Sequence, residues 1–118
     1  MILRMTPNTG NDAHTQDRKA LDDDFHRAML DVYDLCAAHG YKPAQFREMV
    51  SQYGGVVTAH RILKDPEGSG FAKLLLLGLQ KYSTEALVLL PRYRTLFDDH
   101  EIETAKNRMA SNGPISPV

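Results

Sequence analysis

Apolar residues in this chain recur every third or fourth position, in short segments separated by glycine and proline. The first segment runs from Leu21 through Phe25 to Cys36 and ends before Gly40. Such spacing places one apolar stripe along a helix, and a glycine after the stripe is a common left-handed helix end. The pattern therefore predicts a long first helix from about Asp17 to Gly40.

The Gly54-Gly55 pair divides two further segments that have the same helical spacing. Pro43 lies where the earlier segment would begin, a position at which proline sacrifices no helical hydrogen bond. We expect helices over residues 43–53 and 56–64, with the glycine pair as the turn between them. Residues 65–70 then form a loop, because aspartate, proline, serine and glycine favour turns.

The second half of the chain predicts shorter helices. Residues 71–80 are apolar nearly all round, so we expect a helix that is buried on several sides or keeps one face for a partner. The Ser83-Thr84 pair can cap a helix over residues 85–90, for which a strand is the competing interpretation. Asp98 and Glu101 have the spacing of a capping box, which is the clearest helix start in the chain.

These segments together predict an all-α protein: a compact bundle of five or six short helices with one longer N-terminal helix. At 118 residues the chain has room for one ordinary domain. We place that domain at residues 17–110 and expect flexible tails at residues 1–16 and 111–118, which lack a sustained apolar period. The expected core residues are Leu21, Phe25, Met29, Tyr33, Phe46, Met49, Val50, Ile62, Leu63, Phe71, Leu74, Leu75, Leu87, Leu89, Leu96, Phe97, Ile102 and Ala105.

Composition favours a soluble globular protein that is held together by packing. The formal net charge is -1, so no global field draws the chain toward nucleic acid or an anionic membrane. Cys36 is the single cysteine and has no partner for an intrachain disulfide, which is typical of a reducing compartment. The longest apolar run, residues 74–79, is far shorter than the roughly 20 residues of a membrane span. We therefore expect a cytoplasmic protein that does not enter membranes.

Candidate catalytic and metal-binding groups are sparse. No two histidines are four positions apart, and none accompanies a second cysteine, so no metal-ligand spacing emerges. Cys36 and His39 are three residues apart on one predicted helix, but a thiol nucleophile also needs a lowered pKa and an orienting group. A half-buried core cysteine is the simpler interpretation. We expect no enzyme activity, no cofactor and no metal site.

A non-catalytic protein-interaction module is the leading functional prediction, with another protein or a second copy of the chain as its partner. Leucines around position 77 form a face that a short helix cannot wholly bury within its own domain. Downstream, a loop carries tyrosine and arginine, which often anchor interfaces. Alternatively, the tyrosine closes the core and the arginines face solvent. The candidate partner-binding residues are Leu76, Leu77, Leu79, Arg92, Tyr93 and Arg94.

Charge is unevenly distributed along the first half of the chain. Residues 17–34 carry six aspartates against three cations, whereas residues 42–64 carry four cations against one glutamate. Solvated surfaces account for both, but the basic segment also suggests an alternative function, a helix-turn-helix nucleic-acid-binding protein that uses residues 43–64. Few firm cations are available for the phosphate contacts that such binding requires. Its candidate contact residues are Thr58, His60, Arg61 and Lys64.

Short motifs follow one another between residues 46 and 109. They are the Gly54-Gly55-Val56 turn, the helical Ala59-His60-Arg61-Ile62-Leu63 segment, Gly70-Phe71, Glu85-Ala86-Leu87-Val88 and Leu96-Phe97. This order resembles an uncharacterised bacterial family of small helical proteins and protein tails. The family often carries a tryptophan after the Gly-Phe pair and a Gly-Arg-Leu-Asp-Leu run, which residues 74–82 lack. The resemblance implies no established activity and no catalytic residues, but a small accessory module that is sometimes attached to larger enzymes, some acting on DNA.

Overall fold

The computed structural model describes the backbone of residues 5–111 and the side chains of residues 17–111. Within this range every regular element is a helix and there is no strand, which confirms the predicted all-α fold with its longest helix first. The elements are α1 (Met5–Ala38), α2 (Ala44–Tyr53), α3 (Gly55–Lys64), α4 (Ser69–Leu77), η2 (Gln80–Tyr82), α5 (Thr84–Val88), η3 (Arg94–Leu96) and α6 (Asp99–Ala110).

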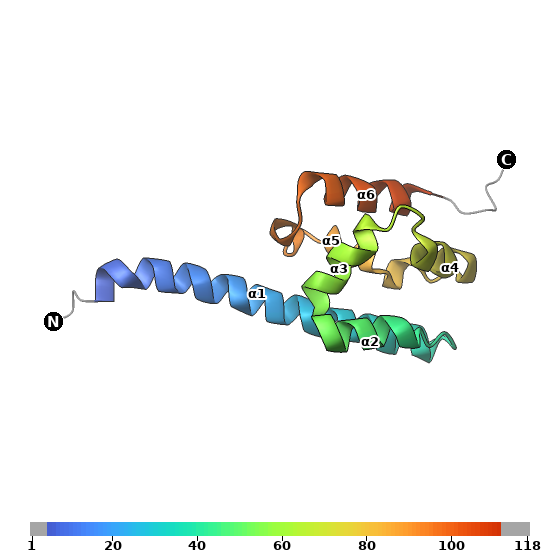
Figure 1. Cartoon of the computed structure of the whole chain (residues 1–118), viewed down its shortest axis with the longest axis horizontal. Helices are drawn as coiled ribbons and strands as arrows, with labels where there is room; N and C mark the ends of the chain where they lie inside the picture. The colour runs from blue at the N-terminus through green and yellow to red at the C-terminus, as the bar shows by residue number, and fades with distance from the viewer. Residues whose placement is uncertain (1–4, 112–118) are drawn as a thin grey trace.

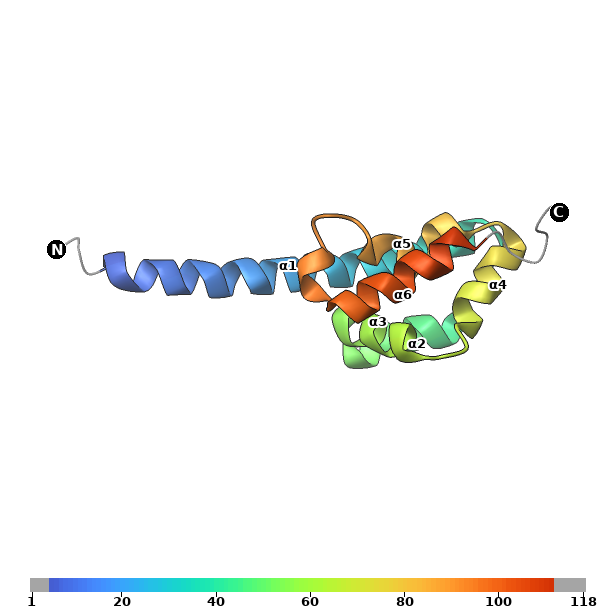
Figure 2. The ribbon, with the colours of Figure 1, turned by 90° about the horizontal axis from the view of Figure 1, so that it is seen from above.

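The helices are arranged around α3, which contacts α1, α2, α5 and α6. One end of α1 packs against α2 and α3, while its N-terminal part projects away from the other helices (Figure 1). The α4 helix lies at the opposite end of the bundle (Figure 2) and packs mainly on η2. This arrangement leaves α4 with much of its surface facing outward.

Several helix boundaries differ from the sequence prediction. The backbone is helical from Met5, so part of the tail expected at residues 1–16 belongs to α1. Pro7 is tolerated in its first turn, because a residue there has no intrahelical hydrogen bond to donate. Residues 1–4 and 112–118, where the remaining tails were expected, lie outside the described residues. The strand considered at residues 86–90 is wrong, since the Ser83 side chain caps α5 by accepting a hydrogen bond from the Ala86 N–H.

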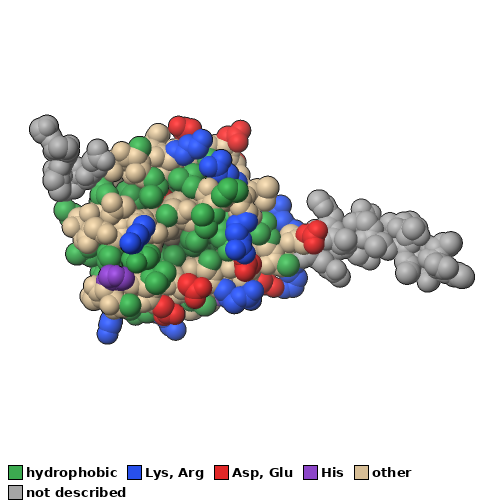
Figure 3. Space-filling view, turned by 180° about the vertical axis from the view of Figure 1, so that it is seen from behind, with side chains coloured by type: hydrophobic (Ala, Val, Ile, Leu, Met, Phe, Trp, Pro, Cys, Tyr) green, Lys and Arg blue, Asp and Glu red, His purple; other side chains and the backbone are tan. Residues whose placement is uncertain are grey.

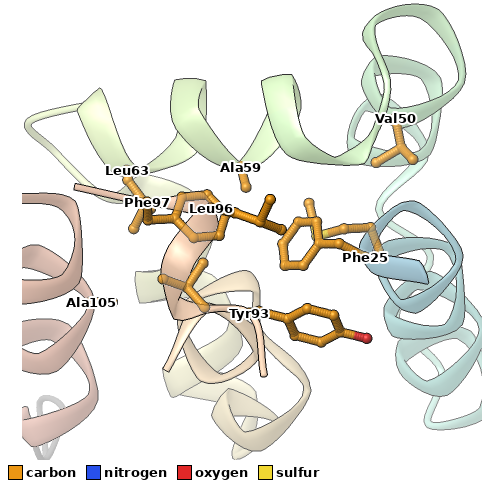
Figure 4. Packing of buried hydrophobic residues seen from close by; sticks show 10 residues of the cluster. Phe25, Val50, Ala59, Leu63, Tyr93, Leu96, Phe97 and Ala105 are labelled. Atoms are coloured by element: carbon orange, nitrogen blue, oxygen red, sulfur yellow. The ribbon is translucent and has the colours of Figure 1, made fainter. Parts of the chain in front are cut away.

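The main hydrophobic cluster is centred on Phe25, which is 0% exposed and reaches from α1 toward the aromatic residues before α6 (Figure 4). Its ring meets the ring of Tyr93 edge-on at 5.0 Å and that of Phe97 at 5.4 Å between centroids. The predicted core omitted Val88 and Tyr93, which are both buried in this cluster. Phe71 is also buried, as expected, but it lies outside the cluster.

The two glycines between α2 and α3 have separate structural roles. Gly54 has φ 90° and ψ 159°, a conformation available almost only to glycine. Gly55 lies so close to α1 that a Cβ atom would come within 2.6 Å of the His26 Cα. Its N–H donates to His26 Nδ1 at 3.0 Å, so α1 satisfies a free donor at the start of α3. The predicted turn is therefore also a point of close contact between α1 and α3.

Both glycines should resist substitution, for different reasons. We expect Gly55→Ala to cost about 1–3 kcal/mol of unfolding free energy, because the new methyl group overpacks against backbone. Gly54→Ala should cost about 1–3 kcal/mol through backbone strain alone, since no atom lies within 4 Å of its Cβ position. Gly70→Ala is the control, with open space and no positive φ. Urea unfolding measures all three, and equal midpoints for Gly55→Ala and Gly70→Ala would contradict the proposed close contact.

Candidate functional site

The leucine face predicted around position 77 is present in part. Leu76 is 66% exposed and Leu77 is 47% exposed on the outer side of α4. Leu79 is buried, which corrects its assignment to this face. The reason is that α4 ends at Gly78 in a left-handed conformation, and the chain turns back so that the Leu79 N–H donates to the Leu74 carbonyl. The candidate docking surface is therefore Leu76 and Leu77.

The three residues predicted to anchor a partner, Arg92, Tyr93 and Arg94, form hydrogen bonds within the protein instead. Tyr93 is buried, and its hydroxyl donates to Asp24 Oδ2 at 2.7 Å. The Arg92 guanidinium pairs with the same carboxylate, while Arg94 Nε donates to the Leu89 carbonyl at 3.1 Å. The hydrogen bond from Tyr93 and the positive charge of Arg92 lower the pKa of the Asp24 carboxyl. Tyr93 closes the core, as the alternative interpretation predicted, and the arginines remain exposed.

The α2–turn–α3 unit places the proposed nucleic-acid contacts on different surfaces. Thr58 is fully buried, so its hydroxyl cannot reach a phosphate. His60 is half-buried, with Nδ1 2.6 Å from Glu101 Oε2 on α6. Arg61 and Lys64 are exposed, and the Arg61 guanidinium lies 4.1 Å from the centre of the Tyr53 ring. Because α3 is surrounded by other helices, only these two cations face outward among the four candidates.

A cleft of about 570 Å³ opens between α2, the end of α3 and the start of α4. Its walls are largely apolar, and two polar side chains, Glu85 of α5 and Arg108 of α6, reach it from behind. The sequence predicted five of the apolar wall residues only as core, because helical spacing shows that a residue points inward but not whether its neighbours fill the space. The apolar wall residues used below are Val32, Phe46, Met49, Ile62, Phe71 and Leu74.

Glu85 and Arg108 form a buried ion pair beside this cleft. Arg108 Nη1 lies 2.9 Å from Glu85 Oε2, and the two side chains are 14% and 2% exposed. The guanidinium also donates to the carbonyls of Ile62 and Asp65, which holds the end of α3 and the following loop. Burial raises the pKa of the Glu85 carboxyl, and Arg108 opposes this effect. The pair was not predicted from the sequence, where its only signal was a lone charged residue, Glu85, in a short helix with apolar neighbours.

The raised pKa of Glu85 has a defined consequence for stability. Above its ordinary pKa of 4.5 the unfolded chain loses this proton first, while the folded protein retains it. Stability from this group is therefore greatest at low pH and falls as pH rises from about 4.5 through the folded pKa. We expect Glu85→Gln to remove this component from the stability–pH curve, as measured by urea unfolding between about pH 4 and 8. The control is the exposed Glu103→Gln; identical slopes for both variants would contradict the prediction.

A second polar pair joins α3 to α6. Glu101 accepts from His60 with one carboxylate oxygen and from the Asp98 N–H, at 3.0 Å, with the other. The Glu101 N–H donates to Asp98 Oδ1 at 2.8 Å, which confirms the predicted capping box. Within residues 17–111 no hydroxyl or thiol group forms a hydrogen bond with His60. The His60–Glu101 pair therefore joins α3 to α6, and no hydroxyl or thiol of the described side chains is positioned beside it as a nucleophile.

Two further properties concern metals and membranes. Among the side chains of residues 17–111, no group of three or more His, Cys, Asp or Glu is placed to hold a metal ion. None of the helices in the described part of the chain combines the length and apolarity that crossing a bilayer demands.

Cys36 is buried, and burial raises the pKa of its thiol, so it lacks the thiolate character of a reactive cysteine.

Comparison of this chain with known protein families, curated proteins and solved structures finds no match. The bacterial family that its motifs resemble therefore stays a prediction. Function must be inferred from the outer face of α4, the cleft and the charges around them.

Proposed function

We propose that this protein is a non-catalytic helical accessory module that docks another protein, or a second copy of itself, through the outer face of α4. The observation that carries this proposal is the exposure of Leu76 and Leu77, 66% and 47%, at neighbouring positions of one short helix. Burying a leucine side chain contributes about 1.5–3 kcal/mol, so a partner that covers both gains substantially. Cys36, the single cysteine, has no disulfide partner within the chain and supports a cytoplasmic location for the module.

The position of α4 also suits docking. It occupies one end of the bundle, away from the projecting part of α1 (Figure 2), where a partner helix or surface can approach without collision. Lys73 lies three and four residues before the two leucines, so all three side chains share one helical face. Seen from behind, hydrophobic side chains also reach the surface elsewhere on the domain (Figure 3), and they supply control positions.

Self-association is tested first, by light scattering over a wide range of protein concentration. If α4 mediates a homodimer, the Leu76→Glu/Leu77→Glu variant should be monomeric at concentrations where the wild type is dimeric. The matched control is Leu35→Glu/Leu90→Glu, which places the same charges on exposed leucines of other elements. A dimer that survives the α4 substitutions but not the control substitutions would overturn the choice of surface.

A strictly monomeric wild type would leave a different protein as the partner. Tagged wild type, α4 variant and control variant would then be purified from the native host under identical conditions. We expect a protein that copurifies with the wild type and the control, but not with the α4 variant. Equal recovery of every copurifying protein with all three would contradict docking through α4.

A further inference from the structure

The cleft between α2 and α4 has the size and lining of a ligand site. Its volume of about 570 Å³ falls within the roughly 300–1,000 Å³ of small-molecule sites. Side chains of α1, α2, α3 and α4 supply its apolar walls. A molecule that enters it would bury mainly hydrocarbon against them.

Three polar side chains that line the cleft, Thr84, Glu85 and Arg108, already have partners. Glu85 is paired with Arg108, and the Thr84 hydroxyl donates to the Met29 sulfur at 3.6 Å. Arg108 further donates to two backbone carbonyls. These groups do not need a ligand to satisfy their hydrogen bonds, so the part of a ligand that lies among them must be apolar.

The end of the cleft near Tyr41 is positively charged. Lys42 lines this end, and Lys73 Nζ lies 5.9 Å from the centre of the Tyr41 ring. Neither lysine forms an ion pair within residues 17–111. Two other charged residues line the cleft but are engaged: the Arg61 guanidinium lies over the Tyr53 ring, and an Asp65 carboxylate oxygen accepts from the Glu67 N–H at 3.1 Å.

We propose that this cleft binds a free long-chain carboxylate, with its hydrocarbon chain against Phe46, Met49 and Phe71 and its anionic group between Lys42 and Lys73. The apolar walls account for the chain, and the two lysines account for the charge. The α4 helix forms one wall of the cleft and is bounded by two left-handed glycines, Gly68 and Gly78. The site uses none of the outer leucines of α4, although Lys73 lies on the same helical face as Leu76 and Leu77.

Cys36 provides a direct test, because it lines the cleft, is 1% exposed and is the only cysteine in the chain. Because Cys36 is so little exposed, alkylation by N-ethylmaleimide requires a transient fluctuation that exposes its thiol. If decanoate occupies it, the alkylation rate should fall in proportion to 1 + [L]/Kd, or about tenfold at ten times Kd. Decyltrimethylammonium has the same chain with the opposite charge and should protect far less. Both are used below the concentrations at which they form micelles.

Variants separate occupancy of the cleft from a general effect on the protein. Ala44 is an exposed lining residue, so Ala44→Trp should obstruct the cleft and abolish saturable protection by decanoate. Ala72→Trp is the control, since Ala72 is exposed on α4 outside the lining. Lys42→Glu should weaken decanoate binding and favour the cationic amphiphile. Amide chemical shifts in NMR should change with decanoate at Phe46 and Leu74.

Protection that is absent, or equal for the two amphiphiles, would overturn the proposed carboxylate. Saturable shift changes confined to residues outside the cleft would overturn the proposed site. If decanoate does not bind but the Leu76→Glu/Leu77→Glu variant still loses a protein partner, the ligand proposal is wrong and the docking proposal stands. If decanoate binds but the variant keeps every partner, docking through α4 is wrong and the ligand proposal stands.

Discussion

Arg108→Met is expected to lower the unfolding free energy by about 3–5 kcal/mol. The substitution leaves the Glu85 carboxylate, of which 2% is exposed, without its cationic partner. It also removes the donors to the carbonyls of Ile62 and Asp65, which hold the loop that leads into α4. An unpaired buried charge is far more costly than the loss of a surface interaction. Urea unfolding at neutral pH measures the effect.

Two further variants test this explanation for Arg108. Removing both charges, as in Glu85→Leu/Arg108→Met, should restore much of the stability, because no isolated charge then remains buried. Arg92→Met breaks the ion pair with Asp24, but the Arg92 side chain is 61% exposed, so we expect a loss of at most about 1 kcal/mol. If the double variant is no more stable than Arg108→Met, the cost arises from lost packing or loop contacts.

Phe25→Ala should produce a loss of similar size, about 3–5 kcal/mol. Phe25 is fully buried and contacts the rings of Tyr93 and Phe97, so truncation opens a cavity where α1 meets the segment before α6. The surrounding helices cannot close this space without breaking other contacts. Chemical denaturation should give a lower midpoint with an unchanged m-value, because the whole domain loses stability together.

Phe71→Ala is the matched comparison. Truncating a fully buried phenylalanine to alanine costs about 3–5 kcal/mol. Phe71 is buried, but it lies outside the main cluster and borders the cleft, so truncation widens an existing space. We expect a smaller global loss and faster hydrogen exchange confined to α4. A global loss for Phe71→Ala as large as that for Phe25→Ala would show that α4 belongs to the same cooperative core.

The helices could be predicted because their signals are local. Helical spacing and the glycine pair placed α2 and α3, and the Asp98–Glu101 spacing placed the start of α6. The errors among the candidate docking residues arose where a side chain depends on what it packs against. The expected face included Leu79, which the turn at Gly78 buries, and the interface anchors included Tyr93, which the core and Asp24 hold.

The candidate sites were predicted less completely than the helices. Leu76 and Leu77 were identified because a short helix that is apolar nearly all round exceeds what one domain can bury. The cleft and its Glu85–Arg108 pair were missed, because the two residues are 23 positions apart and belong to different helices. No periodic pattern links residues at that distance.

The sequence by itself determined which segments are helical and which side of each is apolar, because both depend on residues within one or two turns. The tertiary structure decided which helix faces meet. It brought His26 to Gly55 across 29 positions and His60 to Glu101 across 41. It also left Leu76 exposed and a cleft beside Phe71. These outcomes depend on how chain reversals such as those at Gly54 and Gly78 orient whole helices. The contacts that result join residues far apart in the chain, so they stabilise the protein only once it has folded.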